Sequence, residues 1–189
     1  MSTWTATPDG AAAPRRPADH VAVPLGAVAL AIGVGLLFGQ ARFRVTEAHF
    51  TASIMRLVHM RPATSLGDNV VFPLHGQWVG FSLSVACTAA LLLVPFFVVA
   101  GLLLVARRVE SRRALVALAV TTVVIFLVNQ LRLLVIAGSM LAWGFTTGYE
   151  RSHVFLGTVL STLGVIGGVI IFVWMLVGNA GQRHTGSNP

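Results

Sequence analysis

The chain contains a single cysteine, Cys87, together with two distant residues that could act with a thiol, Arg132 and His153. A thiol attacks a carbonyl carbon only as its thiolate, and a helix N-terminus or a nearby cation stabilises that anion. His153 could take the thiol proton and later hand it to a leaving amine. Arg132 could hold the oxyanion of a tetrahedral intermediate with its fixed fork of donors. Asn129, one turn before Arg132, could hold the guanidinium or bind the backbone of a substrate.

Each of these residues also has an ordinary structural explanation. A single cysteine in an apolar segment is often a small packing residue. Arg132 could extend its charge to the outer headgroups. His153 could be a boundary residue at a helix start, and Asn129 could form a hydrogen bond between helices. Residue types alone leave these alternatives open. The choice between them depends on where the helices and loops place the four residues.

The composition is that of a membrane protein. Charged residues make up 10% of the chain and hydrophobic ones 56%, with a mean hydropathy of +0.83, whereas a soluble domain carries roughly 25% charge. This excludes a water-soluble globule, a disordered chain and a disulfide scaffold. The formal net charge of +7 comes from short Arg clusters between uncharged runs. We interpret it as contact with anionic lipid headgroups rather than with nucleic acid.

Four long uncharged or nearly uncharged runs approach the roughly 20 residues that cross a bilayer. They predict an all-α integral membrane domain over residues 21–178 with about four transmembrane helices, at residues 21–39, 86–106, 114–142 and 154–178. Residues 1–20 lack an apolar period and predict a disordered cytoplasmic tail. Residues 179–189 predict a second cytoplasmic tail.

The segments between these runs predict small elements on the outer side. Residues 41–61 mix charged and apolar side chains, which favours a short amphipathic helix lying on the membrane surface. Residues 69–85 alternate imperfectly around Gly76, which indicates a small hairpin, and Pro73 favours an edge position in it. Residues 144–152 are expected to form an outer loop.

Arginine counts orient the chain and set the depth of the candidate residues. The dense cluster at residues 107–113 should lie inside, which places both termini in the cytoplasm. At 1.5 Å per helical residue, Cys87 lies about 30 Å from Arg107, and Arg132 lies about 27 Å from Ala114. Both distances reach the outer boundary, and His153 directly follows the outer loop. The sequence therefore predicts that the three side chains meet near the outer face.

Three motifs in this order resemble the exosortase/archaeosortase family of membrane transpeptidases. They are Gly76-x-x-Val-x-x-x-Leu-x-Val-Ala-Cys87, then Asn129-Gln-Leu-Arg132 within a span, then His153 at the head of the last span. The resemblance covers residues 67–178 and implies a catalytic triad of Cys87, Arg132 and His153. It also implies cleavage of a C-terminal sorting signal and transfer of the exported protein to a membrane or surface acceptor. Two features depart from the family: Thr88-Ala89 replaces the usual Ser-Gly after the cysteine, and many relatives have more spans.

The expected function is therefore that of a membrane cysteine peptidase or transpeptidase in the cell membrane, with its active site on the extracytoplasmic side. Its expected partners are the bilayer and an exported protein that ends in a hydrophobic helix and a basic tail. The alternative is a non-catalytic scaffold or small transport subunit, in which Arg132 and Asn129 line a pocket for a lipid or peptide. No cofactor or metal is expected, since His49, His59 and His75 lack metal-ligand spacing.

Overall fold

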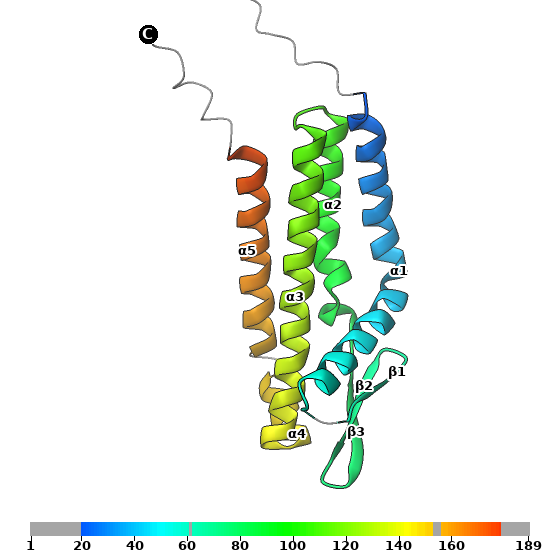
Figure 1. Cartoon of the computed structure of the whole chain (residues 1–189), viewed down its shortest axis with the longest axis vertical. Helices are drawn as coiled ribbons and strands as arrows, with labels where there is room; N and C mark the ends of the chain where they lie inside the picture. Colours follow the sequence, from blue (N-terminus) through cyan, green and yellow to red (C-terminus); the bar gives the residue numbers. More distant parts are fainter. Residues whose placement is uncertain (1–19, 61, 153–155, 179–189) are drawn as a thin grey trace, which may run out of the picture.

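The protein is mostly helical, and its long helices run side by side along one axis, with a small sheet at one end (Figure 1). The structure, a computed structural model, describes residues 20–60, 62–152 and 156–178. The helices are α1 (Ala22–Leu57), α2 (Ala89–Val105), α3 (Ser111–Trp143), α4 (Phe145–Arg151) and α5 (Gly157–Val177), with a 3-10 turn η1 (Val85–Cys87) before α2. The strands are β1 (Thr64–Leu66), β2 (Asn69–Leu74) and β3 (Gln77–Ser82).

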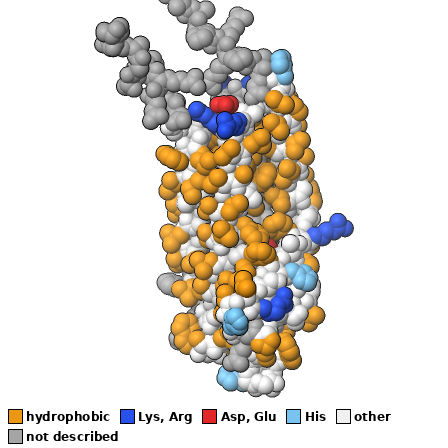
Figure 2. All heavy atoms as spheres, in the orientation of Figure 1, with side chains coloured by type: hydrophobic (Ala, Val, Ile, Leu, Met, Phe, Trp, Pro, Cys, Tyr) orange, Lys and Arg blue, Asp and Glu red, His pale blue; other side chains and the backbone are white. Residues whose placement is uncertain are grey.

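Three of these helices, α1, α3 and α5, are long and apolar enough to cross a membrane. Helix α2 is equally apolar, but its 17 residues rise only about 25 Å, somewhat short of a typical hydrocarbon core. Hydrophobic side chains cover most of the visible face along the helices, with a cluster of charged side chains at the upper end and scattered Arg and His side chains over the lower half (Figure 2). The expected helical architecture is thus confirmed, with three helices that could span a membrane, and the expected number of four spans stays a prediction.

The predicted separate surface helix at residues 41–61 is wrong, because α1 runs without interruption through this segment to Leu57. Gly39 is a weak helix breaker inside an otherwise helical sequence. Beyond Gly39, residues at helical spacing form one face of α1. This face is buried against α3 and the sheet rather than against lipid. The buried residues of that face are Glu47, Ala48, Thr51, Ala52 and Met55.

The predicted hairpin is present as β2 and β3, and β1 extends it to a three-stranded antiparallel sheet in the order β1-β2-β3. His75 and Gly76 form the turn with φ of 50° and 80°, as a two-residue hairpin turn requires. Strand β2 is central, but its pairing with β1 covers only Asn69 to Val71, so Pro73 pairs with β3 alone. The edge position expected for Pro73 therefore holds locally.

Two hydrophobic clusters stabilise the fold. One lies at the sheet end, where the last part of α1, strands β2 and β3, and α3 contribute residues such as Met55, Phe72 and Met140. The other lies among α1, α2, α3 and α5 and includes Phe96, Ile125 and Phe172. The polar candidate site lies along α3 between Ile125 of the helical cluster and Leu133 of the sheet-end cluster.

The expected outer loop at residues 144–152 is largely helical. Gly144 has a φ of 83°, which ends α3, and α4 then folds back so that Gly148 lies against the backbone of Ser139 and Met140. Residues 153–155, and with them the expected start of the last span, lie outside the described residues, and so do both expected tails apart from His20.

Candidate active site

Cys87 lies in the 3-10 turn η1, immediately before helix α2. The residue that caps α2 is Thr88, which has an extended backbone and accepts a hydrogen bond from the backbone N–H of Ala90 at 3.2 Å. Cys87 donates its own N–H to the carbonyl oxygen of Ser84 at 2.9 Å. The expectation that Cys87 lies in the first turn of a helix is therefore wrong by two residues.

The structure brings Cys87 and Arg132 into contact, as their depth along the helices predicts. The Nη2 of Arg132 lies 3.5 Å from Sγ of Cys87, and Nη1 donates to the carbonyl oxygen of Ala86 at 3.2 Å. The Oγ of Ser84 donates to the same sulfur at 3.3 Å. Cys87 is 2% exposed and Arg132 is 6% exposed. A thiolate here would have a guanidinium and a hydroxyl as donors in a place with little water.

The first residue of α5, Gly157, lies against the guanidinium of Arg132. A Cβ added to Gly157 would lie 2.9 Å from Nε of Arg132 and 3.2 Å from the carbonyl oxygen of Ser152. The missing side chain therefore lets the guanidinium pack directly on α5. Among the described residues, Nε of Arg132 has no hydrogen-bond partner.

A fully buried carboxylate, Glu47 of α1, lies beside these residues. Its Oε2 accepts from Oγ1 of Thr88 at 2.7 Å, and its Oε1 accepts from the N–H of Ala89 at 3.0 Å and from Nδ2 of Asn129 at 2.7 Å. The sequence analysis missed Glu47. The signal that could have found it is a carboxylate four residues before Thr51 in an otherwise Arg-rich segment, since this spacing puts both on one helical face.

Asn129 shares the buried face of α3 with Arg132, as expected, but its amide nitrogen is bound to Glu47. Its Oδ1 has no partner among the described residues. Its expected role in binding substrate stays a prediction. In the structure, Asn129 instead links α3 to α1 through its hydrogen bond to Glu47.

The N-terminal N–H groups of α2 are occupied by other acceptors. Ala89 donates to Glu47, and Ala90 donates to Thr88. These groups therefore do not face the sulfur, contrary to the expectation that the helix N-terminus would stabilise the thiolate. The side chains that contact Sγ of Cys87 are instead those of Arg132 and Ser84.

His153, the third expected member of the site, lies outside the described residues. Ser152, just before it, is buried and donates its hydroxyl to the carbonyl oxygen of Gly148 at 2.5 Å. Tyr149 of α4 is within electrostatic reach of the pair: burial raises its pKa above the ordinary value, a charge on Cys87 raises it further, and the charge of Arg132 lowers it. Helix α4 thus approaches the cysteine–arginine pair.

The described residues therefore combine a thiol, a guanidinium, two hydroxyls and a buried carboxylate at the sheet end of the helices. They contain no group of three or more His, Cys, Asp or Glu side chains placed to hold a metal ion. Comparison of the chain with models of protein families, with curated proteins and with solved structures found no match.

Proposed function

We propose that this protein is an integral-membrane cysteine peptidase or transpeptidase of the kind that the exosortase/archaeosortase family represents. The observation that carries the proposal is the contact between Cys87 and Arg132, which are 45 residues apart in sequence. Cys87 is the only thiol of the chain, and it is buried beside a permanent cation. Such an environment suits a nucleophile better than a packing residue.

The proposed reaction proceeds in two acyl transfers. The Cys87 sulfur gives its proton to His153 and attacks the carbonyl carbon of the scissile bond, while Arg132 stabilises the oxyanion. The C–N bond then breaks, His153 returns the proton to the leaving amine, and a thioester remains on Cys87. An acceptor amine attacks the thioester, the C–S bond breaks, and the acceptor's proton passes through His153 to the departing sulfur. Water replaces the amine when the reaction is a hydrolysis.

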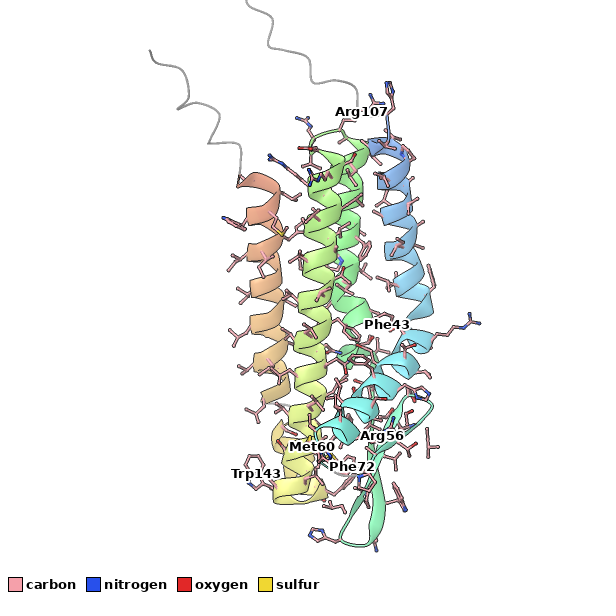
Figure 3. All side chains as sticks on the ribbon, in the orientation of Figure 1. Phe43, Arg56, Met60, Phe72, Arg107 and Trp143 are labelled. Atoms are coloured by element: carbon pink, nitrogen blue, oxygen red, sulfur yellow. The ribbon has the colours of Figure 1, made fainter. Side chains whose placement is uncertain are left out.

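The proposed substrate is an exported protein that ends in a hydrophobic helix followed by a basic tail. The Cys87 end of α2 is opposite the end where Arg107 lies (Figure 3), and the positive-inside rule assigns the Arg-rich end to the cytoplasm. In the cell membrane, the site would then face the extracytoplasmic side. A substrate helix crossing beside the enzyme would present its outer end to Cys87 and leave its basic tail in the cytoplasm.

The test compares the membrane and surface proteins of the producing organism when it carries the wild-type chain, Cys87→Ala or Arg132→Lys. We expect exported proteins with a hydrophobic helix and Arg tail to retain these C-termini in both variants, which quantitative mass spectrometry of C-terminal peptides detects without knowledge of the sorting motif. Arg132→Lys should lower processing roughly 100-fold, because a point charge does not reproduce the planar fork.

The matched control is Arg56→Lys. Arg56 lies at the sheet end and donates to the carbonyl oxygen of Ala63 at 2.7 Å, not to Cys87 or Arg132, so processing should stay normal. Wild-type processing in Cys87→Ala would reject the enzyme. It would favour instead a non-catalytic scaffold or small transport subunit that binds a lipid or peptide near Arg132 and Asn129.

A further inference from the structure

We infer that Glu47 is a positioning residue for this site: its carboxylate joins the start of α2 to α3 and thereby keeps Cys87 in contact with Arg132. The inference rests on the proposed function only where it concerns the processing of a substrate by Cys87. The geometric part concerns the contact between a sulfur and a guanidinium and can be tested without a substrate.

The hydrogen bonds around Glu47 are those that a carboxylate accepts. All three partners, Oγ1 of Thr88, the N–H of Ala89 and Nδ2 of Asn129, are placed to donate to it. The Thr88 hydroxyl already accepts from Ala90, so its own hydrogen is free to point at Glu47. A carboxylate is an acceptor only, and a helix N-terminus favours its negative charge. Glu47 is 0% exposed, so without these donors its burial would be very costly.

The three partners of Glu47 sit next to the two residues that would do the chemistry. Thr88 and Ala89 directly follow Cys87 in sequence, and Asn129 precedes Arg132 by one turn on the same buried face of α3. The contacts of Glu47 therefore fix both ends of the cysteine–arginine pair. They pass through neighbouring residues, which makes Glu47 a positioning residue rather than a catalytic one.

A second buried link between α1 and α3 provides a matched control. One turn beyond Glu47, Oγ1 of Thr51 donates to Oε1 of Gln130 at 2.7 Å, and both residues are buried. This bond joins the same two helices, but it does not reach α2 or the turn that holds Cys87. If Glu47 only held α1 against α3, loss of the Thr51 bond would have the same consequence as loss of Glu47.

The experiment measures how strongly the reactivity of Cys87 depends on Arg132. The purified full-length protein is alkylated with iodoacetamide, and the label reports on Cys87 alone because the chain has one thiol. In the wild-type chain, we expect Arg132→Gln to slow alkylation about 10-fold, because the thiolate loses its cation. In a Glu47→Ala background, the same change should slow it less than about 2-fold, since the guanidinium is no longer held at the sulfur.

Two further backgrounds separate positioning from general stability. Thr51→Val should preserve the full effect of Arg132→Gln. Glu47→Gln keeps a carbonyl oxygen for Ala89 and Asn129, so it should restore an effect between those of Glu47→Ala and the wild-type chain. Glu47→Gln also keeps the test decisive if Glu47→Ala does not fold, because an undiminished Arg132 effect in Glu47→Gln would then overturn the inference.

The outcomes distinguish this inference from the proposed function. An equal effect of Arg132→Gln in the wild-type and Glu47→Ala backgrounds would overturn the positioning role, and so would an equal loss of the effect in Thr51→Val. Processing that depends on Cys87, combined with either result, would leave the proposed function intact. Conversely, a coupling that depends on Glu47 in a chain whose Cys87→Ala variant processes normally would retain the positioning role and reject the enzyme.

Discussion

At the scale of single residues, Arg132 is the point where separate segments of the chain converge. Its guanidinium contacts the carbonyl oxygen of Ala86 and the sulfur of Cys87, and it packs on Gly157 at the start of α5. A planar guanidinium with five donors can serve several partners at fixed angles. Because a side chain at position 157 would meet the guanidinium, the position of the cation depends on a glycine.

Gly157→Ala should therefore displace Arg132 from Cys87. The added Cβ would lie 2.9 Å from Nε of Arg132, and the flexible side chain will move more readily than the backbone of α5. We expect alkylation of Cys87 to slow by about the 10-fold expected for Arg132→Gln, because both changes remove the cation from the sulfur. Gly167→Ala is the control, since a Cβ at this position of the same helix meets nothing within 4 Å. Equal alkylation rates in the two variants would contradict the prediction.

The meeting of Cys87 and Arg132 could be predicted from the sequence because helical rise converts sequence distance into depth. The partners of that pair could not be predicted in the same way. Glu47 belongs to the buried face of α1, and a charged residue on such a face obscures the apolar stripe that marks it. A Thr directly before an apolar run is typical of a helix N-cap, so the sequence could have predicted the cap at Thr88. That cap places Cys87 before the helix and not within it.

At the scale of the elements, α1 and α2 approach each other through glycines. A Cβ on Gly26 would lie 2.7 Å from the carbonyl oxygen of Gly101 and 2.9 Å from the backbone nitrogen of Val105, and one on Gly101 would lie 2.7 Å from Cγ of Leu30. Such backbone contact between small residues is a common way for membrane helices to associate. It matters for the site because α1 carries Glu47 and α2 begins just after Cys87.

Gly26→Ala should destabilise the protein even though alanine is the better helix former. The methyl group meets backbone atoms, which have no room to give way, so we expect the free energy of unfolding to fall by about 1–3 kcal/mol. Gly35→Ala in the same helix meets nothing within 4 Å, and it should leave stability unchanged or raise it by up to about 1 kcal/mol. Unfolding in detergent by chemical denaturant measures both. A loss of stability in Gly35→Ala equal to that in Gly26→Ala would contradict the role of the close approach.

Hydropathy predicted the long helices better than it predicted what lies between them. The run at residues 114–142 corresponds to α3 within a few residues at each end. The segment after Gly39 was misjudged because its charges favour a surface helix, while its continuity with α1 depends on tertiary packing against α3 and β2. Strand β1 has only three residues. A strand this short acquires its structure from pairing with β2 and not from its own sequence.

At the scale of the whole molecule, the arginine cluster around Arg107 and the candidate site lie at opposite ends of α2. Arg107 marks one end of the helices, and Phe72 and Trp143 mark the other (Figure 3). Two arginines lie in the loop between α2 and α3 and two more in the first turn of α3, where Arg113 forms an ion pair with Glu110 at 3.3 Å. Cys87 lies at the far end of α2, some 25 Å of helix away. This separation makes the orientation of the protein decisive for its proposed role.

The orientation can be tested with two single-cysteine variants in a Cys87→Ser background. Gln77→Cys lies on the exposed hairpin, and Val109→Cys lies in the arginine-rich loop. We expect a membrane-impermeant maleimide to label Gln77→Cys in intact cells and Val109→Cys only after permeabilisation, because short Arg-rich loops stay in the cytoplasm. The Cys87→Ser protein without a new cysteine controls for background labelling.

The opposite labelling pattern would have a chemical consequence as well as a topological one. It would place Cys87 and Arg132 at the cytoplasmic face, where exported proteins present their basic tails rather than the outer ends of their hydrophobic helices. Cleavage there would release the tail and leave the exported domain anchored, so the contact between thiol and guanidinium would need a different substrate. Labelling of Gln77→Cys in intact cells therefore bears directly on which side of a substrate helix the thioester can form.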